Sequence, residues 1–229
     1  MGLEEMVFLD RIVFTPDFGR LRQKLRIAAG SSPERELVEL FSDAVTVLRL
    51  KAVYFPAYIE SRIEVSVQVD GVVFHSRVLA VNLQHAHRVF PYLVTCGQEA
   101  EDWLRGIEDI LHQYWADTIL QMALHEALRR METDIQQRYS YPKMASMSPG
   151  RLPHWPVEEQ SALFKLLGEA PSRVGVCLLE SCLMMPAKTL SGIRFPTVES
   201  FESCQLCPRE NCSGRLAPYC PELFARKYA

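Results

Sequence analysis

The sequence has 229 residues, of which 48% are hydrophobic and 23% charged, as in an average soluble globular chain, and its net charge is −3. A chain of this length can bury a core without disulfides, and its acidic balance argues against a general nucleic-acid binder, which needs a basic surface. No apolar run approaches the roughly 20 residues that span a bilayer, and the acidic first residues do not resemble a secretory signal, so we expect a cytoplasmic protein without membrane contact.

The first predicted elements are two helices. An amphipathic helix is expected over 17–29, ending at Gly30, because its apolar side chains recur at helical spacing. The next helix is expected to begin at Ser31, with Pro33 in its first turn, and to run to about Leu50.

Strands are predicted next. Residues 52–58 are rich in aromatic side chains, although Pro56 favours an edge strand or a bulged strand. Residues 62–69 alternate between apolar and polar side chains, as in a half-buried strand. The Asp70-Gly71 pair is a preferred two-residue turn and predicts a hairpin with a returning strand over 72–75.

The middle of the chain predicts a short helix over 77–84, a strand over 88–96 and a long helix over 98–138. The long helix contains no proline, and we expect an interruption near Gly106. Its charge-rich stretch, 126–137, is predicted to be a solvated end.

Four prolines between residues 139 and 156 predict a loop in the second half of the chain. A helix should follow Trp155-Pro156 and close at Gly168, and residues 174–179 are predicted to form a buried strand.

Four of the seven cysteines gather near the end of the chain with the spacing C-x2-C-x4-C-x7-C: Cys204, Cys207, Cys212 and Cys220. An odd number of cysteines without a secretory signal disfavours a disulfide framework and favours metal binding. Four thiolates could hold zinc or a [4Fe–4S] cluster, and the spacing leans towards the cluster because zinc ribbons pair two C-x2-C motifs. Incidental thiols, or a redox disulfide between Cys204 and Cys207, are the alternatives.

Two further segments could bind a polar ligand. In Ser146–Arg151, Gly150 lets a ligand approach the backbone, and Arg151 could pair with a carboxylate or a phosphate, although an ordinary linker is the simpler interpretation. The segment Glu180–Gly192 runs from an apolar strand into a turn broken by Pro186 that carries Lys, Thr, Ser and Gly.

In chain order these segments resemble the activation (reactivation) domain of cobalamin-dependent methionine synthase, and more closely the stand-alone bacterial proteins built on that domain. The similarity covers about residues 5–195 and is most specific over 146–195. It is carried by Leu93–Gly97, Pro149-Gly150, Glu180-Ser181, Met185-Pro186 and Lys188–Gly192.

The resemblance implies an α+β fold, with a curved antiparallel sheet packed with long helices over 1–196 and a Cys-rich tail over 197–229. It implies S-adenosylmethionine as ligand and a corrinoid-binding protein or methionine synthase core, carrying cobalamin, as partner. It also implies an electron donor such as a flavodoxin or ferredoxin, for the reductive methylation of oxidised cobalt. At 229 residues the chain would be an accessory protein and not a complete enzyme, so we assign no catalytic residue.

The family loop has an Arg four residues before its Gly and a Tyr directly after it, where this chain has Ser146 and Arg151. Arg151 is therefore the candidate to replace the family's carboxylate contact, and Asp117 and Glu126 are the nearest candidate acids. The other functional alternatives are a metal- or iron–sulfur-binding electron-transfer adaptor and a partner-binding domain with neither ligand. The predicted ligand-binding residues are Pro149, Gly150, Arg151, Glu180, Pro186, Ser191 and Gly192.

Overall fold

The computed structural model describes residues 6–10, 12–15, 17–152, 154–197, 203–209, 211, 215 and 217–228. The strands are β1 (Val7–Leu9), β2 (Lys51–Tyr54), β3 (Ala57–Ile63), β4 (Ser66–Val69), β5 (Val72–His75), β6 (Arg88–Thr95), β7 (Met144–Met147), β8 (Cys177–Leu178), β9 (Met184–Met185) and β10 (Thr189–Pro196). The helices are α1 (Phe18–Leu25), α2 (Ser32–Val47), α3 (Arg77–Asn82), α4 (Gln98–Arg105), α5 (Ile110–Tyr139), α6 (Gln160–Leu167), α7 (Ala170–Arg173) and α8 (Pro221–Tyr228), with 3-10 turns η2 (Val157–Glu159) and η3 (Ser203–Leu206).

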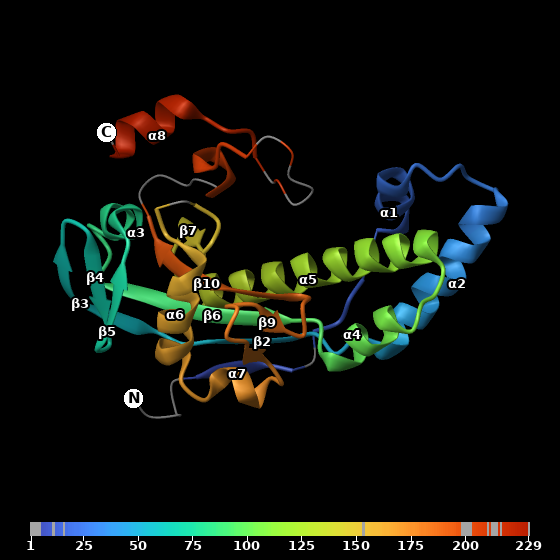
Figure 1. The fold of residues 1–229 in the computed structure, drawn as a ribbon, viewed down its shortest axis with the longest axis horizontal. Coiled ribbons are helices and arrows are strands. Elements are labelled where there is room, and N and C mark those ends of the chain that lie inside the picture. Colours follow the sequence, from blue (N-terminus) through green and yellow to red (C-terminus); the bar gives the residue numbers. More distant parts are fainter. Residues whose placement is uncertain are drawn as a thin grey trace.

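The strands form an eight-stranded sheet and a separate hairpin of β8 and β9, and every pairing is antiparallel (Figure 1). The expected α+β class with an antiparallel sheet is therefore confirmed. β6 lies at the centre of the large sheet, because β10 pairs with it along one edge and both β2 and β3 pair with the other. β10 also pairs with β7, which brings the loop after β7 close to the centre of the sheet.

The central strand β6 supplies both layers of the core. Successive side chains of a strand point to opposite faces, so Val89 and Leu93 pack in a cluster with buried residues of α3 and α6. Phe90, Tyr92 and Val94 pack in a second cluster with buried residues of α5, which runs across this face of the sheet (Figure 1). A third cluster joins α1 and α2 to the first half of α5.

Both predicted helix starts near the N-terminus agree with the structure, but one predicted end is wrong. The Ser31 hydroxyl accepts a hydrogen bond from the Glu34 amide at 3.4 Å, as expected for a residue that caps a helix. α1 ends at Leu25 and not at Gly30, because Arg26 adopts the left-handed conformation, with φ 56°, and its amide bonds to the carbonyls of the last turn.

The predicted long helix is confirmed together with its interruption, as α4 ends at Arg105 and α5 begins at Ile110. The Asp109 carboxylate caps the start of α5 by accepting from the His112 amide at 2.8 Å. The solvated end predicted over 126–137 is wrong in part, because this stretch contributes buried side chains to the core and charged side chains to a cleft described below.

Two of the predicted strands are shorter than expected. Residues 62–69 are not one strand, because β3 ends at Ile63 and a turn separates it from β4. The buried strand predicted over 174–179 is reduced to the two residues of β8, after a turn, and is not buried, because Cys177 is exposed. The Asp70-Gly71 hairpin turn is confirmed, with positive φ angles at both residues.

One of the two predictions for Pro56, a position in an edge strand, is wrong. It lies buried in the break between β2 and β3, both of which pair with β6. Because a proline has no amide hydrogen to donate to a sheet, the break places it where the chain passes from one strand to the next.

The described part of the tail packs on the body of the protein. Leu206 is 0% exposed within the cluster on the α3 and α6 face, and the Tyr228 hydroxyl accepts a hydrogen bond from Asn82. Burial raises the pKa of Tyr228 to about 12. The boundary between 196 and 197 stays a prediction. Among the described residues, no helix combines the length and hydrophobicity needed to cross a bilayer.

Candidate functional site

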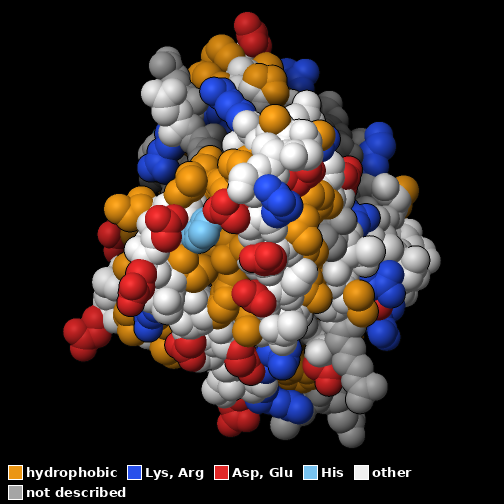
Figure 2. Space-filling view, turned by 90° about the vertical axis from the view of Figure 1, so that its right-hand side faces the viewer, with side chains coloured by type: hydrophobic (Ala, Val, Ile, Leu, Met, Phe, Trp, Pro, Cys, Tyr) orange, Lys and Arg blue, Asp and Glu red, His pale blue; other side chains and the backbone are white. Residues whose placement is uncertain are grey.

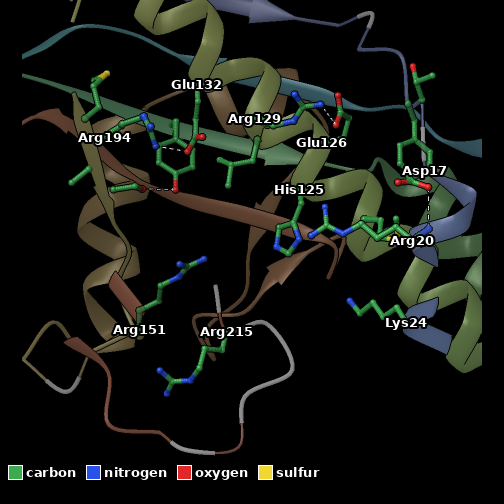
Figure 3. Close-up of a pocket in the computed structure, with 18 of the residues that line it drawn as sticks. Asp17, Arg20, Lys24, His125, Glu126, Arg129, Glu132, Arg151, Arg194 and Arg215 are labelled. Atoms are coloured by element: carbon green, nitrogen blue, oxygen red, sulfur yellow. Dashed lines mark hydrogen bonds and ion pairs between the residues drawn. The ribbon is translucent and has the colours of Figure 1, made fainter. Parts of the chain in front are cut away.

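A cleft of about 820 Å³ opens between α1, the outer face of α5 and the strands β7 and β10 (Figure 3). We call it the α1–α5 cleft. A cavity of this size suits a ligand as large as a nucleoside derivative. Its described lining consists of Phe14, Thr15, Asp17, Arg20, Gln23, Lys24, Tyr92, Met122, His125, Glu126, Leu128, Arg129, Glu132, Met144, Ala145, Ser146, Arg151, Arg194 and Arg215.

The helix α5 supplies one wall of the α1–α5 cleft. Residues three, four and seven apart share a face of a helix, which explains why His125, Arg129 and Glu132 all reach the cleft. Met122 and Leu128 add apolar surface to the same wall. The wall therefore combines apolar surface for a ring with charged groups for polar atoms.

The opposite wall comes from the sheet. The Tyr92 hydroxyl lies 2.9 Å from the Ser146 hydroxyl, joining β6 to β7. Arg194 pairs with Ser146 in register between β10 and β7, and it lines the cleft beside Tyr92. A side chain at Gly192 would force its neighbours apart, because a Cβ there would lie 2.6 Å from both the Met147 carbonyl oxygen and the Ser148 hydroxyl.

Two more segments complete the rim. Arg20 and Lys24, four residues apart on α1, project towards the cleft, and the Asp17 carboxylate caps their helix by accepting from the Arg20 amide at 3.0 Å (Figure 3). Across the cleft stand Arg151 from the loop after β7 and Arg215 from the tail (Figure 3). The Arg215 guanidinium donates to the backbone carbonyls of neighbouring tail residues: Cys204 and Cys207 at 3.1 Å, Ala217 at 3.0 Å, and Arg209.

The electrostatics of the α1–α5 cleft are positive. Glu126 is paired with Arg129, and Glu132 with Arg194, so two of the arginines are neutralised. His125 is half-buried at the centre of the cleft, and burial, together with the positive charges of Lys24, Arg151, Arg20 and Lys188, holds its pKa below the usual value. The imidazole is therefore neutral at neutral pH and can accept as well as donate a hydrogen bond.

The structure brings several predicted ligand-binding residues together. Arg151 lines the α1–α5 cleft. The Gly150 amide donates to the Trp155 carbonyl at 2.8 Å, and Gly150 packs against Val157, which fixes the turn that carries Arg151. Pro149 is buried beside Gly150. Gly192 touches the start of the same loop, so the loop after β7 and the strand β10 form one structure.

Other predicted residues lie elsewhere. Glu180 is exposed in the turn between β8 and β9, and Pro186 is buried next to the residue whose amide donates to Glu101 at 2.9 Å. The Ser191 hydroxyl accepts from Gln160 of α6, which packs on the sheet face opposite α5. Of the two candidate acids, Glu126 lines the α1–α5 cleft, whereas Asp117 forms an ion pair with Lys188 at 2.7 Å and is not part of the lining.

The described residues do not assemble a metal site. No three side chains of His, Cys, Asp or Glu within the part of the chain that the structure describes are grouped as a metal ion would need. Cys204, Cys207 and Cys220 belong to this part, whereas Cys212 lies outside it. The predicted zinc or iron–sulfur site therefore rests on the cysteine spacing alone.

Sequence reasoning missed much of the cleft. Arg20 and Lys24 were parts of an amphipathic helix with ordinary solvated charges, and no element was predicted for the segment that contains Arg194. The one available signal was the i, i+4 spacing of Arg20 and Lys24, which shows that they share a face but not what lies opposite. His125 gave no signal, since no His, Cys, Asp or Glu lies three or four residues from it in the chain.

No protein-family model matches this sequence, and no curated protein matches it in sequence. Among solved structures, the chain is similar to the crystal structure of the MetH reactivation domain bound to AdoHcy, with a TM-score of 0.57 and 15% sequence identity. The match covers 86% of this chain and 81% of that domain. At this identity the similarity shows a shared fold.

Proposed function

We propose that this protein binds S-adenosylmethionine, or a closely related nucleoside, in the α1–α5 cleft and serves as an accessory protein in the reactivation of a corrinoid enzyme. The observation that carries the proposal is the contact between Gly192 and the loop that presents Arg151, at the edge of a cleft of about 820 Å³. The fold shared with a reactivation domain solved with AdoHcy supports the same conclusion.

The lining of the α1–α5 cleft fits the chemistry of such a ligand. Arg151 is exposed at the rim and can form a bidentate pair with the carboxylate of the methionine part. Phe14, Met122 and Leu128 offer apolar surface to an adenine ring. Glu126 and Glu132, each already paired with an arginine, are the two glutamates of the lining that an ammonium group could approach.

The partner in this proposal is a corrinoid-binding protein or a methionine synthase core that carries cobalamin. S-adenosylmethionine supplies a methyl group, and an electron donor such as a flavodoxin or ferredoxin supplies the electron. The residues of this chain would hold and orient the nucleoside, with Arg151 fixing its carboxylate end and the α5 wall its apolar part. Such a protein positions a reactant for a partner and needs no catalytic residue of its own.

The Cys-rich tail has a proposed role beside the cleft. Arg215 lines the cleft and donates to the carbonyls of Cys204 and Cys207, so it ties the cysteine segment to the rim. A zinc ion or an iron–sulfur cluster held by Cys204, Cys207, Cys212 and Cys220 would be located near the ligand. The alternative function, an electron-transfer adaptor for a corrinoid protein, depends on that cluster.

Calorimetric titration with S-adenosylmethionine tests the proposal. We expect saturable binding, and a loss of about tenfold in Arg151→Ala, as for one charge-assisted hydrogen bond of roughly 1.5 kcal/mol. Arg35→Ala is the matched control, because Arg35 is exposed on α2 and does not line the cleft. The absence of both heat and thermal stabilisation at saturating ligand would overturn the proposal, since a ligand that binds only the folded state must raise stability.

A further inference from the structure

The α1–α5 cleft carries more positive charge than the single carboxylate of S-adenosylmethionine would neutralise. Six Arg or Lys side chains and three Asp or Glu side chains line it, whereas the whole chain carries a net charge of −3. The end of the molecule formed by α1, α2 and α4 shows acidic side chains around apolar ones (Figure 2). The lining of the cleft is therefore positive although the chain as a whole is negative.

The acids of the α1–α5 cleft are already engaged. Glu126 and Glu132 each hold one arginine, and the Asp17 carboxylate caps α1. Arg20, Lys24 and Arg151 form no ion pair with any described residue. Arg215 donates to carbonyl oxygens, which leaves its positive charge without a carboxylate among the described residues.

These cations surround one space. Figure 3 shows Arg20 and Lys24 on one side, Arg151 and Arg215 on the other, and His125 between them. Burial is the main cause of the lowered pKa of His125, and the positive charges of Lys24, Arg151 and Arg20 lower it further, in agreement with this geometry. A single carboxylate would neutralise only one of them, whereas a phosphate carries about two negative charges and three acceptor oxygens.

We infer that the α1–α5 cleft contains a phosphate-binding subsite, with Arg20 and Lys24 on its α1 side and Arg151 facing them across the cleft, and that the cleft accepts a nucleoside phosphate. The volume of about 820 Å³ far exceeds that of a phosphate ion, and the apolar side chains of Phe14, Met122 and Leu128 provide a surface for a base. The phosphate-binding subsite lies in the same cleft as the proposed S-adenosylmethionine site, but it binds a different ligand.

The test is a calorimetric series with ADP, AMP, adenosine and inorganic phosphate on the full chain. We expect ADP to bind more tightly than AMP, and AMP more tightly than adenosine, with an affinity for ADP that falls as NaCl is added. Weak binding of inorganic phosphate alone would support the subsite as well, because the cations act on the phosphate itself. Equal affinities for ADP and adenosine, or no binding of ADP, would overturn the inference.

The double variant Arg20→Gln/Lys24→Gln tests the residues. Both side chains are exposed on α1, so the variant should fold, and we expect ADP affinity to fall by about tenfold or more while adenosine affinity is unchanged. The matched control is Arg35→Gln/Lys165→Gln, which removes the same charge from exposed positions of α2 and α6. If the two variants bind ADP equally well, the inference is wrong.

Arg151→Gln provides a second variant that does not depend on α1. It should also weaken ADP binding by about tenfold, and full retention of ADP affinity would count against the subsite. A parallel titration with S-adenosylmethionine separates the two proposals. Binding of S-adenosylmethionine without ADP overturns this inference alone, and binding of ADP without S-adenosylmethionine overturns the proposed function alone.

Discussion

Replacement of Gly192 by Ala tests how tightly the residues in the wall of the α1–α5 cleft are packed. The added Cβ would lie 2.6 Å from the Met147 carbonyl oxygen, 2.6 Å from the Ser148 hydroxyl and 2.9 Å from the Tyr92 hydroxyl. The first of these atoms belongs to the backbone of β7, which is held by its pairing with β10 and cannot rotate away. The strands must therefore separate by about 0.8 Å to restore ordinary contact distances of roughly 3.4 Å.

The expected cost follows from two terms. Overpacking a well-packed region costs about 1–3 kcal/mol, and the displaced hydroxyls would lose the hydrogen bond between Tyr92 and Ser146, at about 0.5–1.5 kcal/mol. We therefore expect Gly192→Ala to lower the free energy of unfolding by about 2–4 kcal/mol. In a chain of this length that loss corresponds to a fall in Tm of about 5–15 °C.

Urea unfolding followed by circular dichroism measures this loss, with two variants beside it. Gly106→Ala is the control, since Gly106 has an ordinary φ of −75° and its nearest atoms would lie 3.5 Å and 3.7 Å from a Cβ. It should be neutral or gain up to about 1 kcal/mol from reduced chain entropy. Tyr92→Phe removes only the hydroxyl and should cost about 1 kcal/mol. Equal stability of Gly192→Ala and Gly106→Ala would refute the steric reasoning.

Three further predictions address the cleft and the tail. NMR titration of the ring protons should give His125 a pKa below the usual value of about 6.5. The pKa should rise in Lys24→Gln, because one of the positive charges that oppose protonation is removed. An unchanged pKa in this variant would contradict the contribution of Lys24. Leu206→Ala should lower the stability of the whole chain by about 2–5 kcal/mol in one cooperative unfolding transition, whereas a tail that folds independently would leave the main transition in place. Anaerobically purified protein with an iron–sulfur cluster should absorb near ~400 nm, and Cys204→Ser should abolish this band; stoichiometric zinc without colour would exclude the cluster.

Some features of the fold are set by a few adjacent residues, and the sequence alone predicted most of these. The Ser31 cap, the Asp70-Gly71 turn and the interruption of the long helix near Gly106 are properties of a few adjacent residues, and all three were predictable. One error also has a local cause, because a single residue in an unexpected conformation was enough to move a helix boundary. Arg26 in the left-handed region ended α1 five residues before Gly30.

The sequence by itself determined the α+β composition, the caps and turns, and the two segments at Ser146–Arg151 and Gly192 that meet beside the α1–α5 cleft. Only the tertiary structure decided which charges share that cleft. Leu21 of α1 packs with Trp115 and Ile119 of α5, and this contact places Arg20 opposite a strand that is more than 100 residues away in the chain. Such contacts depend on the packing of whole elements, which short-range spacing does not encode, so a charge that looks solvated in the sequence can become part of a binding site.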